Sequence, residues 1–322
     1  MSAKTFAITG ATGFVGKALL RHVPENAQLR LLVRDRQKLQ APANATIIEG
    51  ALSDAQALLD LCQGADVVIH VAGAIKAMDR KGFHDVNEKA VIALAEAARK
   101  SGVKRFIYVS SLAAREPSLS DYAASKRAGE HGLAYAARDM EWVIVRPPAI
   151  YGPGDEATLP LMRALTSKRA ILPGSSEQLI SLMHVDDVAQ ALWLATQETV
   201  VAGKVYEVDD GKKAGYSWAE LCSLAEAYEG HEVKALFVSR WILTPIAGLV
   251  QLWAEITRQP QILSAGKIAE LYHEDWVARG PELAGFSPKI GFAQGFAETV
   301  SSYRAAGRLR ARREAATTQK QS

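Results

Sequence analysis

Short apolar segments alternate with longer helix-forming stretches through the first half of the chain, and this alternation limits the fold more than any other feature. The apolar segments predict strands, and they cover residues 5–9, 29–33, 45–49, 65–73, 104–111 and 141–148. The stretches between several of them have spaced apolar positions typical of amphipathic helices. Strands that are apolar throughout and separated by helices form a parallel sheet covered on both faces. We therefore predict an α/β fold with a doubly wound parallel sheet.

Three glycines spaced three residues apart follow the first predicted strand: Gly10, Gly13 and Gly16 in TGATGFVG. They stand where that strand passes into a helix predicted over residues 14–22. At such a junction glycine allows a tight turn and a close approach of the backbone, and the helix N-terminus attracts phosphate. The alternative is a glycine-rich turn without a ligand. The strand before and the helix after favour a dinucleotide site, although the spacing is not the usual GxGxxG.

The end of the second strand indicates which dinucleotide binds. Arg34 stands 18 residues after Gly16, where binders of the unphosphorylated cofactor usually carry an acidic residue for the ribose 2′-hydroxyl. A guanidinium suits a 2′-phosphate through charged, bidentate hydrogen bonds. The sequence therefore favours NADP, and the neighbouring Asp35 keeps NAD open as the alternative.

The stretch SSLAAREPSLSDYAASK carries residues suited to proton transfer. Tyr122 and Lys126 lie four apart in a helical stretch, so both side chains project from one face. A nearby ammonium favours phenolate, so we expect Lys126 to lower the pKa of Tyr122 from about 10. The tyrosine would exchange a proton with a substrate hydroxyl or carbonyl while hydride moves to or from nicotinamide. Ser111 is expected to donate to the same oxygen, with Ser110 as its competitor.

TGATGFVG, Ser111 with YAASK, and RPPAIYGPGD at 146–155 together resemble the extended short-chain dehydrogenase/reductase superfamily, which includes sugar-nucleotide epimerases and dehydratases. The resemblance extends to about residue 305. It implies a Rossmann domain over residues 1–150, whose sheet is completed by parts of 179–210, and a smaller, mostly helical substrate-binding region over 151–307. It also makes a homodimer the expected assembly.

The same resemblance assigns residues to the site. It implies a catalytic set of Ser111, Tyr122 and Lys126, of which Tyr122 and Lys126 also contact the cofactor. Together with the glycine motif it implies these further cofactor-binding residues: Thr9, Gly10, Thr12, Gly13, Phe14, Val15, Gly16, Arg34, Leu52, Asp54, Val71, Ala72, Gly73, Asn87, Pro147 and Ala149. Leu52 and Asp54 would border the adenine, and Pro147 and Ala149 would lie against the nicotinamide.

The substrate follows from which branch of the superfamily the chain resembles. The segment QLISLMHVDDVA lacks the arginine with which sugar-nucleotide members hold a diphosphate. Its sequence resembles more closely that of 3β-hydroxysteroid dehydrogenases and dihydroflavonol reductases. We therefore expect an oxidoreductase acting on a secondary alcohol or ketone of an apolar, sterol-, isoprenoid- or quinone-like molecule. A sugar-nucleotide epimerase or dehydratase is one alternative.

The second alternative is a non-catalytic NADP(H)-binding module of a respiratory or membrane-associated assembly. Tyr122 stands only 11 positions after Ser111, a short spacing that resembles the atypical branch related to a respiratory complex I accessory subunit. The complete set of serine, tyrosine and lysine favours the enzyme.

The composition limits the binding partners and the cellular compartment that we expect for the protein. A net charge of +3 over 322 residues gives no argument for nucleic acid, and the scattered histidines and two cysteines predict no metal site. The first strand begins within five residues of Met1, so we expect a cytoplasmic protein. The uncharged run 241–254 is too short for a membrane span and is read as a buried helix, a lid or a peripheral membrane contact. Residues 308–322 are predicted to be a disordered basic tail.

Overall fold

The computed structural model describes residues 4–245 and 264–311. The strands of its main sheet are β1 (Thr5–Thr9), β2 (Gln28–Val33), β3 (Ala45–Glu49), β4 (Val67–His70), β5 (Arg105–Val109), β6 (Glu141–Arg146) and β11 (Lys204–Glu207). They lie in the order β11-β6-β5-β4-β1-β2-β3, and all neighbouring strands are parallel. The chain order reverses between β1 and β4, which opens a crevice at their carboxyl ends.

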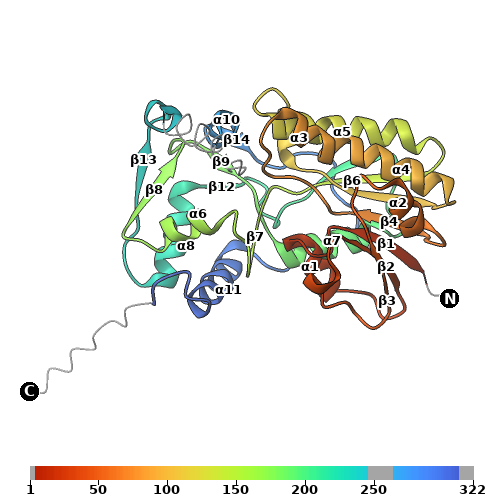
Figure 1. The fold of residues 1–322 in the computed structure, drawn as a ribbon. Helices are drawn as coiled ribbons and strands as arrows, with labels where there is room; N and C mark the ends of the chain where they lie inside the picture. Colours follow the sequence, from red (N-terminus) through yellow and green to blue (C-terminus); the bar gives the residue numbers. More distant parts are fainter. Residues whose placement is uncertain (1–3, 246–263, 312–322) are drawn as a thin grey trace, which may run out of the picture.

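Helices cover both faces of this sheet, as Figure 1 shows. Those on one face are α1 (Phe14–Arg21) and α7 (Val185–Ala195); those on the other are α2 (Ala55–Cys62), α3 (Arg80–His84), α4 (Ala90–Lys100) and α5 (Asp121–Ala137). Successive residues of a strand point to opposite faces, so Ile8 packs with the first group while Ala7 packs with the second. The doubly wound α/β fold predicted from the sequence is therefore confirmed.

The other half of the molecule combines helices with three small sheets, which the sequence did not predict (Figure 1). Its helices are α6 (Leu159–Leu165), α8 (Trp218–Glu229), α10 (Ala265–Leu271) and α11 (Phe292–Ala305). The small sheets pair β7 (Ala149–Tyr151) with β10 (Leu182–His184), β8 (Arg169–Pro173) with β13 (Lys234–Val238), and β9 (Leu179–Ile180) with β12 (Tyr216–Ser217) and β14 (Asp275–Trp276). A separate core around Met162, Leu221 and Phe296 holds these elements together.

Two predicted segments extend beyond the described residues. The chain is helical from Arg240 to Pro245, whereas residues 246–254 of the uncharged run lie outside the described part. The same holds for residues 312–322 of the predicted tail. Among the residues that the structure describes, no helix has both the length and the apolar character needed to span a membrane.

Candidate functional site

The glycine turn after β1 has the geometry that a pyrophosphate requires. Gly10 has a φ of +78°, and a Cβ there would come within 2.6 Å of the Ala72 nitrogen. A Cβ on Gly16 would lie 2.0 Å from the Gly10 carbonyl oxygen, so this glycine allows α1 to pack against the turn. Gly13 is exposed and stands at the N-cap of α1. The N–H groups that begin this helix can therefore meet an anion without a side chain in between.

The ends of β1 and β4 are tied together by side chains. The Thr9 hydroxyl lies 2.7 Å from His70 Nδ1 and accepts a hydrogen bond from the Ala72 nitrogen at 3.4 Å. Complete burial, and then the charge of Lys126, lower the pKa of His70 to about 3, so the imidazole is neutral. Thr9 thus fixes the loop of Val71 and Ala72, and its own side chain is buried. This role, and that of His70, were missed in the sequence.

Asn87 lies in a π-helical turn, Asp85–Lys89, between α3 and α4. Its amide oxygen accepts from the Ala74 nitrogen at 2.8 Å, and its amide nitrogen donates to the Ala74 carbonyl at 2.9 Å and to the Ser125 hydroxyl at 3.0 Å. Such turns occur frequently at functional sites. Asn87 therefore holds the loop after β4 against α5, beside Gly73, whose Cβ would lie 3.1 Å from Lys126 Nζ.

Ser111 and Tyr122 meet although the connection between them is short. Ser111 follows β5 and caps a 3₁₀ turn, Leu112–Arg115, by accepting from the Ala113 nitrogen at 3.2 Å. Tyr122 stands in the first turn of α5, and its hydroxyl lies near enough to Ser111 for the serine to lower its pKa. Ser110 donates instead to a carboxylate oxygen of Glu130 at 2.5 Å. Of the two candidate serines, Ser111 is therefore the one at the tyrosine.

The protonation of this cluster differs from the expectation. Burial raises the pKa of Tyr122 to about 12; the neighbouring Ser111 side chain opposes this effect, and the Glu270 carboxylate adds to it. Burial lowers the pKa of Lys126 to about 8. Its ammonium donates to the Val109 carbonyl at 2.8 Å. The expectation that Lys126 lowers the tyrosine's pKa is therefore wrong here, because burial has the larger effect. A tyrosine that keeps its proton suits donation to a carbonyl oxygen.

The two charged residues after β2, Arg34 and Asp35, have different surroundings. Asp35 caps a short 3₁₀ turn by accepting from the Gln37 nitrogen at 3.0 Å, and it pairs with Lys38 at 3.6 Å. Arg34 is exposed. The carboxylate that kept NAD open is thus engaged locally, while the guanidinium lies at the surface after the strand.

The remaining cofactor candidates lie along the same edge of the sheet, because parallel strands all end there. Asp54 caps α2 by accepting from the Gln56 and Ala57 nitrogens at 3.0 and 3.1 Å, and Leu52 before it is half-buried. Pro147 is buried after β6, where its carbonyl accepts from the Leu112 nitrogen at 2.9 Å. The other candidates with side chains or backbone at this edge are Thr12, Phe14 and Val15, all half-buried, and Ala149, which is exposed.

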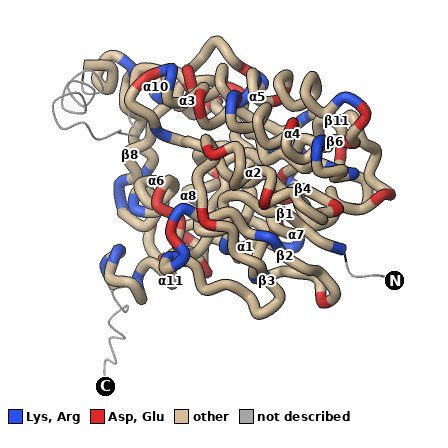
Figure 2. Tube along the Cα trace, turned by 45° about the vertical axis from the view of Figure 1, so that its right-hand side comes forward, with Lys and Arg blue, Asp and Glu red and all other residues tan. Residues whose placement is uncertain are grey.

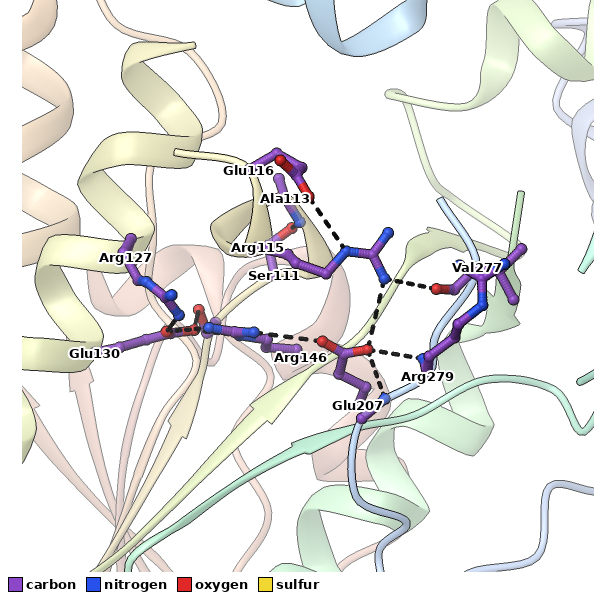
Figure 3. A network of polar contacts seen from close by, with 12 residues as sticks. Ser111, Ala113, Arg115, Glu116, Arg127, Glu130, Arg146, Glu207, Val277 and Arg279 are labelled. Carbon is purple, nitrogen blue, oxygen red and sulfur yellow. Dashed lines mark hydrogen bonds and ion pairs between the residues drawn. The ribbon is translucent and has the colours of Figure 1, made fainter. Parts of the chain in front are cut away.

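Behind the site, charged side chains of alternating sign form a buried chain (Figure 3). Arg146, at the end of β6, donates to the two carboxylate oxygens of Glu130 at 2.8 and 2.6 Å and to Glu207 at 3.3 Å. The side chains of Arg146, Glu130 and Glu207 are 8%, 3% and 6% exposed. Glu130 stands one helical turn after Lys126 and works against the lowering of its pKa. The four-residue spacing from Lys126 was the signal in the sequence that could have found it.

This chain of charges reaches the C-terminal half. Glu207 accepts from the Arg279 and Gly280 nitrogens, both at 2.9 Å. Arg115 lies 3.9 Å from Glu207 and donates to the Asp275 and Val277 carbonyls at 2.6 and 2.7 Å. The 3₁₀ turn after Ser111 and the segment after β14 are thereby held against each other (Figure 3).

A cavity of about 840 Å³ opens where α10 meets the connection between Ser111 and Tyr122. Ser118 and Leu119 line it on one side, and Gly266 and neighbouring residues of α10 line it on the other. Glu270 fixes α10 in this place by accepting a hydrogen bond from the hydroxyl of Ser120, the cap of α5. A cavity of this size is within the usual range for small-molecule sites.

Known proteins resemble the chain in both sequence and fold. Residues 6–209 match the NAD dependent epimerase/dehydratase family. The chain is 43% identical to the ceramide reductase of Caulobacter vibrioides over 308 residues, 94% of this chain and 95% of that protein. It is 27% identical over 282 residues to the mitochondrial NADH-ubiquinone oxidoreductase 40 kDa subunit of Neurospora crassa, covering 84% of this chain and 71% of that protein. A solved UDP-glucuronic acid 4-epimerase from Bacillus cereus has a TM-score of 0.74 at 17% identity, covering 94% and 99% of the two chains.

The family match covers the sheet and the glycine turn, and the ceramide reductase aligns through both halves of the chain. The residues at the carboxyl edge fit a nicotinamide dinucleotide. Gly13 leaves the start of α1 open, and the loop after β4 lies against Gly10 at Ala72 and against Lys126 at Gly73. The resemblance to extended short-chain dehydrogenases/reductases is thereby confirmed. The chain belongs to the NAD-dependent epimerase/dehydratase family and is an NAD(P)-dependent oxidoreductase.

Proposed function

We propose that this enzyme transfers hydride between NADP(H) and a ketone or secondary alcohol on a long-chain lipid of the ceramide class. The observation that carries the proposal is the placement of Tyr122 in the first turn of α5 beside Ser111 at the end of β5, where burial raises the pKa of the tyrosine to about 12 and it keeps its proton. A protonated tyrosine suits the reductive direction, because the ketone oxygen must gain a proton as hydride arrives. The 43% identity to a protein named ceramide reductase supports the substrate class.

Each residue of the cluster has a distinct task in the proposed reaction. NADPH supplies the hydride when it is bound. Tyr122 donates its proton to the substrate oxygen, and the Ser111 hydroxyl donates a hydrogen bond to the same atom. A Cβ on Gly73 would lie 3.1 Å from Lys126 Nζ and 3.3 Å from the Asn87 amide oxygen, so the ammonium lies beside this loop. There Lys126 holds the ribose of the cofactor. Asn87 acts as a positioning residue, since its amide groups are satisfied by Ala74 and Ser125.

The second half of the chain supports an apolar substrate over a sugar nucleotide. In the segment where nucleotide-sugar enzymes carry an arginine, this chain has Leu182 and Ser181, and both are buried. The Ser181 hydroxyl already accepts from the Ala278 nitrogen at 3.1 Å. A diphosphate would find no charged partner in this segment. In the cavity beside α10, Leu119, Ala265 and Ala269 offer an apolar wall to a hydrocarbon chain, and Arg240, His273, Glu274 and Asp275 offer polar groups to a headgroup.

The non-catalytic alternative rested on the short connection between Ser111 and Tyr122. The proximity of the two side chains counts against it, because the strand end and the helix start bring them together without a longer loop. The similarity to the respiratory subunit is weaker than that to the reductase, at 27% against 43% identity.

Arg34 is the residue on which the preference for NADP rests, so its replacement is the direct test. We expect Arg34→Ala to weaken NADPH binding about tenfold or more, because a charged hydrogen bond contributes ~1.5–3 kcal/mol, and to leave NADH binding unchanged. Fluorescence titration of both cofactors with wild-type and variant protein measures this. Lys38→Ala, which removes a charge already paired with Asp35, is the matched control. Equal loss of both cofactors would contradict the proposed contact with the 2′-phosphate.

Consumption of NADPH tests the reaction itself. We expect oxidation of NADPH with detergent-dispersed long-chain keto lipids of the ceramide class, with one secondary alcohol formed per NADPH, and none with UDP-sugars. Product analysis by mass spectrometry should show a gain of two hydrogen atoms. Conversion of a UDP-sugar to its epimer without net change in cofactor would instead support the epimerase alternative.

A further inference from the structure

The outer face of the small sheet formed by β8 and β13 presents apolar and basic side chains in register. Ile171 stands opposite Leu236, and Arg169 stands opposite Lys234. Residues two apart in a strand share a face, so all four side chains point the same way. Ile171 is 65% and Leu236 is 45% exposed, and both basic residues are exposed. On the opposite face, Ala170 and Leu172 join the core of the C-terminal half, whereas Phe237, which stands opposite Leu172, is 41% exposed.

The exposed character continues in the chain after β13. Trp241 is 87% exposed and Ile242 is exposed as well, directly after the basic Arg240. We define the β8–β13 patch as Arg169, Ile171, Lys234, Leu236, Arg240, Trp241 and Ile242. Figure 1 shows β8 and β13 at the end of the molecule farthest from β1–β3, and Figure 2 shows basic segments beside β8. The acidic group paired with this patch is Glu232, 3.6 Å from Lys234.

We propose that the β8–β13 patch docks the enzyme on the surface of an anionic lipid bilayer. Exposed apolar side chains that stand opposite each other on two strands mark interaction sites, and an exposed tryptophan next to a basic residue in the following segment suits the boundary between headgroups and acyl chains. The basic residues add attraction to anionic headgroups at about 1 kcal/mol each. A protein partner would also cover the apolar residues, but Arg169 and Arg240, which have no ion pair within the described part of the chain, favour an anionic bilayer.

The patch adjoins the proposed substrate cavity. Arg240 belongs to the patch and also lines the cavity, together with Tyr272 after α10. The Tyr272 hydroxyl donates to the Val238 carbonyl, which fixes the end of β13 to the cavity wall. Docking at this face would place the cavity beside the bilayer, so that a long-chain lipid could enter it with little exposure of its chain to water. The entry of a lipid substrate from the bilayer rests on the proposed function, whereas the docking of the protein on the bilayer does not.

Flotation of the full-length protein with vesicles tests the docking without any turnover. We expect the protein to float with vesicles of phosphatidylcholine mixed with phosphatidylglycerol, more weakly at high salt, and to float poorly with phosphatidylcholine alone. Arg169→Gln combined with Lys234→Gln should lower the partition coefficient about 25-fold, since about 1 kcal/mol for each charge corresponds to about fivefold. Ile171→Ser combined with Trp241→Ser should lower it at least tenfold, because two apolar side chains lose their contact with lipid.

The control is Val201→Ser, which removes another exposed apolar side chain, 61% exposed, at the far side of the main sheet beside β11. It should float as the wild type does, and NADPH binding by all variants should show that they are folded. Failure of the wild-type protein to float with either vesicle overturns the proposal, and so does flotation that survives both double substitutions. A wild-type dimer that Ile171→Ser dissociates, without any flotation, would assign the patch to a protein contact. Turnover of dispersed lipid is measured separately, so that failure of docking and failure of the reaction are distinguished.

Discussion

Replacing Tyr122 with phenylalanine is expected to lower kcat for ketone reduction by about 10²–10⁴-fold, the usual contribution of a positioned general acid. The variant keeps the aromatic ring, which lies 6.1 Å from the Phe83 ring between centroids, and it loses only the hydroxyl that meets Ser111. Binding of NADPH should therefore stay close to that of the wild type. Stopped-flow absorbance gives the rate, and fluorescence titration gives the affinity.

Tyr135→Phe is the matched control, because Tyr135 stands on the same helix and is largely exposed. Its kcat should equal that of the wild type. Reduction at an undiminished rate by Tyr122→Phe would remove the tyrosine from the reaction, even if the substrate assignment held. Binding of NADPH by both proteins without consumption of any lipid ketone would instead favour the non-catalytic alternative.

The fold was predictable because its signals are local in the sequence. The β1 strand, the glycine turn and the start of α1 occupy neighbouring residues, and each of the six predicted strands corresponds to an observed one. The three small sheets were missed because their strands have two to five residues and pair across long distances in the chain. The pairing of β9 with β12 and β14 has no counterpart in any local pattern.

The residues assigned to the candidate site stay predictions, and their electrostatics differ from what the sequence indicated. Ser111, Tyr122 and Lys126 were recognised from spacing, and the structure brings the two hydroxyls together. The direction of the tyrosine's pKa was wrong because spacing reveals a neighbouring charge but not the burial that outweighs it. The hydrogen bonds of Asn87 and the partner of Thr9 depend on contacts between segments 13 to 61 residues apart, which periodicity does not report.

The buried charges behind the site carry the largest expected effect on stability. Arg146→Met keeps most of the side-chain volume but leaves Glu130 and Glu207 without their shared guanidinium. Breaking a buried ion pair by removing one partner costs about 3–5 kcal/mol, because the remaining charge stays away from water. Chemical unfolding followed by circular dichroism should show a loss of this size. Arg308→Met, which removes an exposed pair with Glu156, should show little change.

A double-mutant cycle then separates the ion pair from the arginine's other contacts. Glu130→Met alone leaves Arg146 with Glu207, and the combined variant replaces the closest pair by two apolar side chains, which in buried sites is often neutral or stabilising. We therefore expect the double variant to be more stable than the sum of the single losses predicts, by about 0.5–3 kcal/mol. Purely additive losses would mean that Arg146 acts mainly through Glu207. Because Glu207 ends β11 and also accepts from the Arg279 and Gly280 nitrogens, that result would place the stabilising contact between β6, β11 and the C-terminal half and not between β6 and α5.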